Sequence, residues 1–172
     1  MTDAIEHPKL HLGTAPDSWG VWMPGLDPLQ PPWQRYLDEV QVAGYRYSEL
    51  GPFGYLPTDP GIIREEYAKR GLTLTGGTVF AALHKGRAAL EQAKRDCDIE
   101  MATIGPLGAT HVVILPEGYS DLEGNLTGPT TLTDDEWTSL NTGMSELGRY
   151  LADRHGAVLV FHTHADSHVG TQ

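Results

Sequence analysis

Short apolar runs that favour β-strands alternate with helix-length segments along this chain. The runs start near residues 10, 45, 72, 110 and 157, and each interval has room for one helix. Because strand–helix–strand order produces parallel strands joined by right-handed crossovers, the chain is predicted to be α/β. Two architectures satisfy this order: an open, doubly wound sheet, and the first part of a (β/α)8 barrel.

Residues that start and end helices support four intervening helices. Asp59 followed by Pro60 has the form of an N-cap and a first-turn proline. Thr133 and Glu136 have the spacing of a capping box at the start of the last helix. The predicted helices cover residues 32–43, 59–70, about 86–104 and 133–154.

The barrel is favoured because the nucleotide-binding fingerprints of open sheets are missing. No Gly-x-Gly-x-x-Gly follows the first strand, and no Gly-x-x-x-x-Gly-Lys-Ser/Thr occurs. The segments after strands one, two, four and five are long and polar, as in barrel loops that build a site. A full barrel takes about 250 residues. Residues 1–172 are therefore expected to be the N-terminal portion of a TIM barrel, a single and apparently truncated domain.

Charge and cysteine content exclude several classes of function. The 23 acidic residues outnumber the 12 basic ones, and the net charge is −11. This balance argues against nucleic acids and anionic membranes as partners, because both need clustered Lys and Arg. Cys97 is the only cysteine, so no disulfide framework is expected. Without a signal peptide or a membrane-spanning run, we expect a cytoplasmic protein.

Polar groups gather at the end of the fifth predicted strand, and strand ends are where α/β proteins carry their chemistry. Residues 157–161 lead into His162 and His164, which share one face because strand side chains alternate. Two imidazoles on one rim can ligate a divalent metal or bond a sugar hydroxyl. Asp166 and His168 follow in the loop and can support them. The alternative is a pair of polar residues satisfied by water.

Two glutamates lie at corresponding positions on other strands. Glu49 ends the second predicted strand, and Glu117 lies two residues past the fourth. Each is a candidate general acid or base, and Glu49 is also a candidate anchor for a hydroxyl. The structural alternatives stay open. Glu49 can cap backbone amides of the loop that follows it, and Glu117 can be an exposed loop residue.

Three further residues are candidates for binding a substrate. His84 follows the third strand and either reaches the rim or starts the next helix. Trp19 follows the first strand and either stacks on the apolar face of a sugar or packs its own loop. His168 joins them from the last loop. His11 and His111 lie inside predicted strands, so we assign them to the core or to the lower end of the barrel.

The chain contains the stretches GTAPDSWG at 13–20, SELGPFGYLPTDP at 48–60, GLTLTGG at 71–77, FHTH at 161–164 and VGTQ at 169–172. These stretches resemble inosose dehydratases and the related sugar isomerases and epimerases of the xylose isomerase-like superfamily. The resemblance implies a barrel with a divalent metal, Mn²⁺, Co²⁺ or Mg²⁺, at its carboxyl-terminal rim. It also implies proton transfer next to a carbonyl, in the isomerisation, epimerisation or dehydration of a sugar or inositol derivative.

The resemblance also implies roles for individual residues. Glu117 matches the dehydratases' glutamate after the fourth strand, and His162 and His164 match their fifth-strand histidines, the expected metal ligands. Epimerases of the superfamily carry a metal-binding glutamate at the position of His162. Their ligands from strands six to eight have no counterpart in these 172 residues. We therefore expect weak metal binding by this chain alone.

Three functions stay open at this point. The first is a metal-dependent sugar or polyol isomerase or epimerase, and the second is an inosose dehydratase-type lyase. The third is a truncated, non-catalytic chain or half of a split barrel. In that case a homo-oligomer or a complementing C-terminal half is the expected partner.

Overall fold

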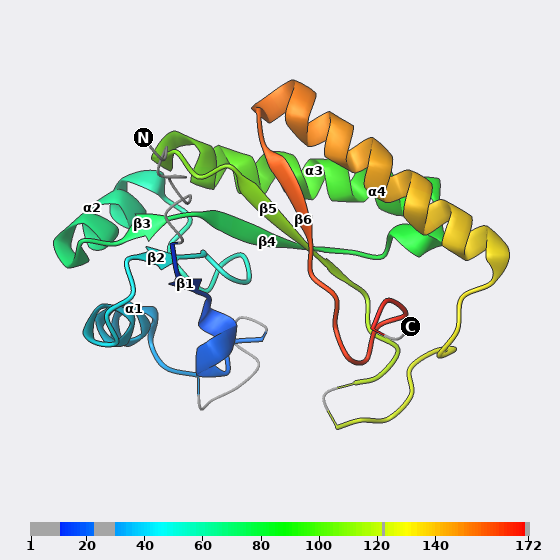
Figure 1. The fold of residues 1–172 in the computed structure, drawn as a ribbon, viewed down its shortest axis with the longest axis horizontal. Helices are drawn as coiled ribbons and strands as arrows, with labels where there is room; N and C mark the ends of the chain where they lie inside the picture. Colours follow the sequence, from blue (N-terminus) through cyan, green and yellow to red (C-terminus); the bar gives the residue numbers. More distant parts are fainter. Residues whose placement is uncertain (1–10, 23–29, 122, 171–172) are drawn as a thin grey trace, which may run out of the picture.

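The computed structural model describes residues 11–22, 30–121 and 123–170, which form an α/β fold (Figure 1). Its strands make two parallel sheets of three strands each. The first sheet has the order β1 (Gly13–Thr14), β2 (Tyr47–Ser48) and β3 (Thr73–Leu74). The second has the order β4 (Gly76–Ala81), β5 (His111–Pro116) and β6 (Val158–Phe161).

The two sheets are parts of one bent sheet, because β3 and β4 are consecutive pieces of the same strand separated by Thr75. Thr75 N donates to Ser48 O at 3.0 Å, and His111 N donates to Thr75 O at 3.3 Å. Beyond the bend, Leu50 N donates to Gly76 O at 2.8 Å. The described strands therefore follow one another in sequence order without a reversal. This order confirms the predicted partial barrel rather than the doubly wound sheet.

Local capping interactions define the helix ends. α2 (Pro60–Arg70) follows Asp59, whose side chain accepts hydrogen bonds from two backbone amides of the first turn. α4 (Asp134–His155) follows Thr133, which forms the predicted capping box with Glu136. The other α-helices of the described residues are α1 (Trp33–Val42) and α3 (Arg87–Ile104). In the described part of the chain, no helix combines the length and apolar character that a bilayer span requires.

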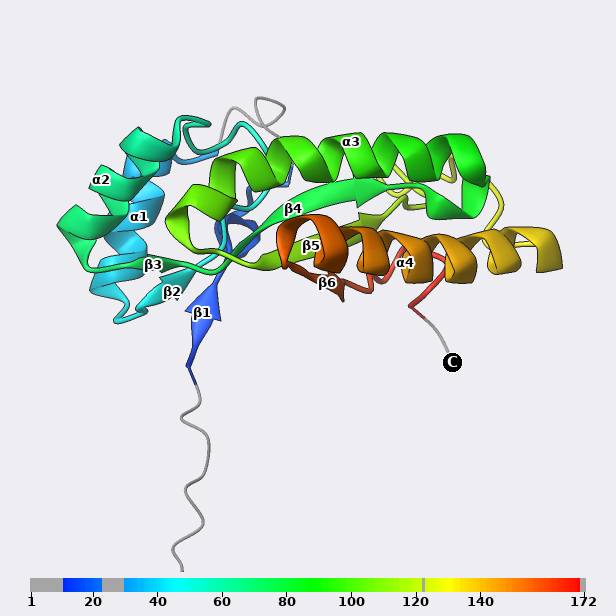
Figure 2. The same ribbon diagram turned by 90° about the horizontal axis from the view of Figure 1, so that it is seen from above.

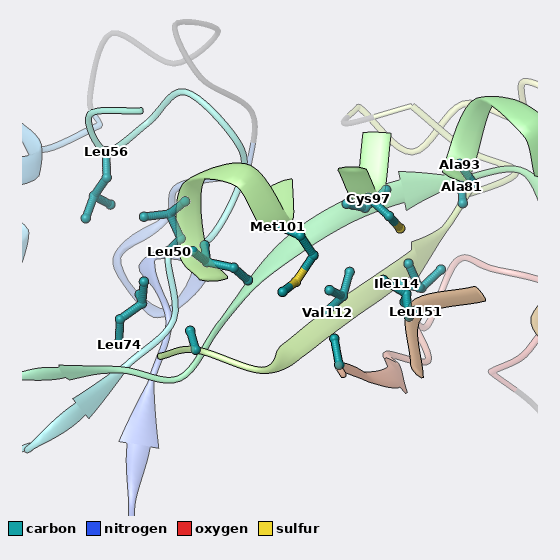
Figure 3. Packing of buried hydrophobic residues seen from close by; sticks show 14 of the residues in the cluster. Leu50, Leu56, Leu74, Ala81, Ala93, Cys97, Met101, Val112, Ile114 and Leu151 are labelled. Atoms are coloured by element: carbon teal, nitrogen blue, oxygen red, sulfur yellow. The ribbon is translucent and has the colours of Figure 1, made fainter. Parts of the chain in front are cut away.

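The core lies between the helices and one face of the sheet. α3 and α4 lie side by side against the sheet of β4, β5 and β6 (Figure 2). Cys97 and Met101 of α3 lie opposite Val112 and Ile114 of β5, and all four are buried (Figure 3). Burial of an aliphatic side chain of this size contributes about 1.5–3 kcal/mol. Cys97 is fully buried in this layer and behaves as a small apolar side chain.

The other face of the second sheet carries apolar side chains that reach solvent. Phe80 of β4 is 43% exposed, and Val158 and Val160 of β6 are 54% and 39% exposed. Their neighbours in the strands, Val79 and Leu159, belong to the packed core. The alternation follows from the period of two along a strand. In a closed barrel, the face that carries Phe80 and the two valines would line the interior.

The first strand differs from the prediction. Leu10 lies outside the described residues, and strand pairing begins at Gly13, so His11 precedes β1. His11 is exposed, with its ring centroid 4.7 Å from that of Tyr47. His111 is exposed as the first residue of β5. Neither histidine is a core residue. Both lie at the amino-terminal end of the sheet, because each comes before or at the first paired residue of its strand.

Candidate functional site

A cavity of about 890 Å³ opens where β4, β5 and β6 end. Parallel strands bring their carboxyl ends to the same edge of a sheet, so the segments that leave them meet there. Figure 1 shows the loops after β5 and β6 at this edge. Five of the predicted site residues line the cavity: His84, Glu117, His162, His164 and His168.

His162 and His164 both line the cavity, with ring centroids 6.1 Å apart. Nδ1 of His164 contacts the carboxylate of Asp166. The other oxygen of this carboxylate accepts a hydrogen bond from Ser120 Oγ at 3.0 Å. Trp22 stands edge-on to the His164 ring at a centroid distance of 5.7 Å. One imidazole is thus oriented by a carboxylate, and an aromatic ring packs beside it.

Glu117 also lines the cavity and has two basic side chains beside it. Lys85 Nζ is 2.5 Å from Glu117 Oε2, and His84 Nε2 is 3.7 Å from the same oxygen. Lys85 and His84 belong to the short helix η2 (Leu83–Lys85) that follows β4. Burial lowers the pKa of His84, and the nearby His168 adds to this effect. An imidazole and an ammonium therefore flank the carboxylate, and burial disfavours the charged form of the imidazole.

His168 reaches the cavity but is engaged by the protein itself. Its Nε2 donates to the carbonyl oxygen of Pro129 at 2.9 Å. Its ring lies 5.2 Å from that of His84 and 5.6 Å from that of Tyr119. This hydrogen bond ties the end of the chain to the loop after β5. A substrate contact through Nε2 of His168, as predicted, would have to replace this hydrogen bond to Pro129.

Asp17 is a cavity residue that the sequence prediction missed. It belongs to the short helix η1 (Pro16–Trp19), directly after β1, and its carboxylate is half-buried. Burial raises the pKa of Asp17, while the charges of His162 and His164 act in the opposite direction. Its carboxylate therefore lies within electrostatic reach of the histidine pair. The position of Asp17 directly after the first strand could have predicted it as a site residue.

Trp19 does not line the cavity, so the structure does not support its predicted stacking on a sugar. Its indole Nε1 donates to Glu39 Oε2 at 2.7 Å. Its ring packs edge-on against Tyr36 at 5.0 Å. Both partners belong to α1, so the indole fixes η1 against that helix. Trp22, three residues later, lines the cavity instead and is 48% exposed.

Glu49 also stays outside the cavity wall. It follows β2, and its backbone N donates to Thr14 O at 2.9 Å. Burial raises the pKa of Glu49, and the carboxylate of Asp17 raises it further. Glu49 is thus coupled electrostatically to Asp17, which does line the cavity. Its role as an acid or base stays a prediction.

The described residues do not form a complete metal site. No group of three or more His, Cys, Asp or Glu side chains within the described ranges is placed to hold a metal ion. His162 and His164 offer two imidazoles, fewer than the ligand sets typical of a divalent metal in a catalytic site. One nitrogen of His164 is already occupied by Asp166. The histidine pair therefore fits a metal only as part of a larger ligand set.

Comparison with known proteins gives relatives in sequence and in fold. No protein-family model matches the chain. An inosose dehydratase from Bacillus licheniformis is 29% identical over 142 residues, which are 81% of this chain and 45% of the relative. The chain spans about half the length of the curated relatives it matches.

Solved structures share the fold at lower sequence identity. A sugar phosphate isomerase/epimerase from Parabacteroides distasonis has a TM-score of 0.61 at 15% identity, covering 95% of this chain and 55% of its own. A xylose isomerase-like TIM barrel protein from Mycobacterium smegmatis, solved in complex with magnesium, has a TM-score of 0.55 at 18% identity. It covers 81% of this chain and 49% of its own. These likenesses show the fold.

Proposed function

Since this chain is a relative of the inosose dehydratases with the fold of xylose isomerase-like barrels, we propose that it carries the proton-transfer rim of a sugar or polyol isomerase, epimerase or dehydratase. One observation supports this most directly. Acid–base side chains from three strand exits, His84, Glu117, His162 and His164, line one cavity together with Asp17. A site of this composition suits the movement of protons on a polyhydroxylated ketone.

In the proposed reaction, Glu117 removes the proton from the carbon next to the substrate carbonyl. Lys85 holds this carboxylate through the 2.5 Å ion pair, and in the proposed reaction its ammonium stabilises the negative charge that develops on the carbonyl oxygen. His164, oriented by Asp166, moves a proton at a substrate hydroxyl. Return of the proton from Glu117 to carbon gives isomerisation or epimerisation, and its transfer to the neighbouring hydroxyl, which leaves as water, gives dehydration.

The apolar part of the cavity suits the carbon-bound face of a sugar ring. Trp22, Phe80 and Leu132 line the cavity beside the polar groups. Aromatic faces pack well against C–H groups while the hydroxyls turn to polar partners. The substrate class we propose is therefore a sugar or an inositol derivative. Trp22 takes the role first assigned to Trp19.

A divalent metal would polarise the substrate oxygens when bound. His162 and His164 would be its ligands from this chain, and the described residues do not complete the set. We therefore assign no step to a metal.

We also propose that the chain is the N-terminal portion of a barrel that a second copy or a complementing C-terminal half completes. The exposed face with Phe80, Val158 and Val160 supports this proposal.

A second candidate function is sugar binding without turnover by this chain alone, and the incomplete ligand set favours it. An exchange experiment separates the two functions. The chain is mixed with an inosose or a ketohexose in D₂O, with and without Mn²⁺, and loss of the proton next to the carbonyl is followed by NMR.

We expect the unmodified chain to exchange the proton next to the carbonyl, and we expect Glu117→Gln to abolish this exchange. Glu123→Gln, in the same loop but outside the cavity lining, is the matched control. Binding without exchange would support the second candidate, and neither binding nor exchange would overturn both. Exchange that appears only when a C-terminal half is added would support the split barrel.

A further inference from the structure

We propose that Ser120 and Asp166 are positioning residues that hold the His164 ring in one orientation and, in its neutral form, in the Nδ1–H tautomer. The inference rests on the proposed function, because it explains how His164 is oriented for proton transfer. Its test needs no substrate. It links the loop after β5 to a histidine delivered by β6. The loop between β5 and α4 therefore helps to orient His164 in addition to lining the cavity.

The Asp166 carboxylate uses its two oxygens toward two different loops. Oδ1 contacts Nδ1 of His164, two residues earlier in the β6 loop. Oδ2 accepts a hydrogen bond from Ser120 Oγ, which comes from the β5 loop, at 3.0 Å. With both oxygens engaged, the carboxylate plane is held from two directions. Rotation of the Asp166 side chain would break one of the two contacts.

Backbone contacts hold the two loops in register around this carboxylate. Tyr119 N donates to Asp166 O at 2.9 Å, and Gly118 pairs with Ser167 as an antiparallel bridge. Ser167 is buried, and its hydroxyl donates to His164 O at 2.8 Å. The backbones on both sides of the histidine–aspartate contact are therefore fixed. The backbone contacts between the two loops therefore fix the positions from which His164 and Asp166 reach each other.

Hydrogen-bond chemistry then sets the tautomer. An ionised carboxylate accepts hydrogen bonds and cannot donate, so Nδ1 of His164 carries the proton. In the neutral imidazole this leaves Nε2 with a free lone pair. Since His164 lines the cavity and Asp166 engages Nδ1, Nε2 is the nitrogen left for a substrate hydroxyl or, when a metal is bound, for the metal. Trp22, edge-on at 5.7 Å, limits the ring's freedom on one side.

NMR of the histidine side-chain nitrogens tests the proposal on the full chain, at a pH where the imidazoles are neutral. We expect His164 as the Nδ1–H tautomer. His155 gives an internal reference of the opposite tautomer, because its Nε2 faces Asp98 Oδ1 at 2.7 Å. Asp166→Ala should cause loss of the Nδ1–H signal of His164 and leave His155 unchanged. Asp166→Asn should retain the signal, because the amide oxygen still accepts a hydrogen bond.

Ser120→Ala removes the second contact and leaves the His164–Asp166 pair in place. We expect a partial loss of the Nδ1–H population, which identifies the contribution of the β5 loop. Ser145→Ala is the matched control, because the Ser145 hydroxyl bonds within α4. Ser120→Ala also keeps the proposal testable should Asp166→Ala fail to fold.

Two results would overturn the proposal. One is an Nε2–H tautomer of His164 in the unmodified chain. The other is an unchanged Nδ1–H signal in a folded Asp166→Ala variant. The exchange experiment on Glu117 reports separately on the proposed function. The expected tautomer without any exchange would leave the positioning role in place and remove the proposed function.

Discussion

The carboxyl group of Glu100 on α3 occupies the space that a side chain at Gly77 of β4 would fill. Glu100 is 1% exposed, and neither carboxyl oxygen has a hydrogen-bond partner among the described residues. Burial raises the pKa of Glu100 to about 8. Since a buried unpaired charge is costly, the group is carried in its neutral form near neutral pH. Glycine at position 77 is what makes room for it.

We predict that Gly77→Ala destabilises the protein by about 1–3 kcal/mol, because the added methyl group collides with Glu100 in a packed interface. Urea denaturation followed by circular dichroism measures the effect. Gly128→Ala is the control, because a methyl group there meets nothing within 4 Å and Gly128 lacks a positive φ. Gly77→Ala combined with Glu100→Ala should recover part of the lost stability. Equal stability of both single glycine variants would contradict the packing argument.

Glu100 should also make stability depend on pH. Its folded pKa of about 8 lies above the 4.5 of a solvent-exposed glutamate, so the folded state holds the proton more tightly. The contribution to stability is complete below pH 4.5 and is lost as the pH rises toward 8, by up to about 1.4 kcal/mol per pH unit. Glu100→Gln should flatten the profile, measured by urea denaturation between pH 5 and 9. Parallel profiles for the two proteins would show that Glu100 does not titrate in this window.

Alanine substitutions of Trp22 and Trp19 should affect different properties, ligand binding for Trp22 and stability for Trp19. Trp22→Ala should weaken binding of a sugar ligand by about tenfold, equivalent to about 1.4 kcal/mol, and leave stability nearly unchanged. Trp19→Ala should lower the free energy of unfolding by about 3 kcal/mol, because it removes the packing against Tyr36 and the bond to Glu39. Calorimetric titration and urea denaturation on both variants test this. A binding loss confined to Trp19→Ala would reverse the assignment.

The capping box of α4 should contribute measurably to folding. Thr133→Ala removes the hydroxyl that accepts from Glu136 N at 3.3 Å and should cost about 1 kcal/mol. Thr130→Ala, in the exposed segment before the helix, is the control. The free energy of unfolding reports the difference. A null effect would mean that tertiary contacts alone determine where α4 begins.

Features set by neighbouring residues were predictable from the sequence. The N-cap Asp59 and the Thr133–Glu136 box act over a few residues, and the structure starts α2 and α4 at these positions. The parallel direction of the strands also followed from the sequence, because each intervening helix produces a parallel crossover. Their order was predicted from the missing nucleotide-binding fingerprints, which favoured the barrel over the doubly wound sheet. With the strands parallel, the exits that carry His84, Glu117 and His162 had to meet at one edge of the sheet.

Contacts across space were decided by the tertiary structure. The segment from β3 to β4 reads as one strand in sequence, yet the fold bends it at Thr75 and divides the sheet. Trp19 and Trp22 are alike in sequence, and only the position of α1 turns Trp19 away from the cavity. The sequence pattern of α3 does not indicate that Glu100 is buried. Its burial depends on the packing of α3 over Gly77 of β4. Chain-local propensities cannot reveal these pairings, because each depends on residues that approach one another only after the helices pack on the sheet.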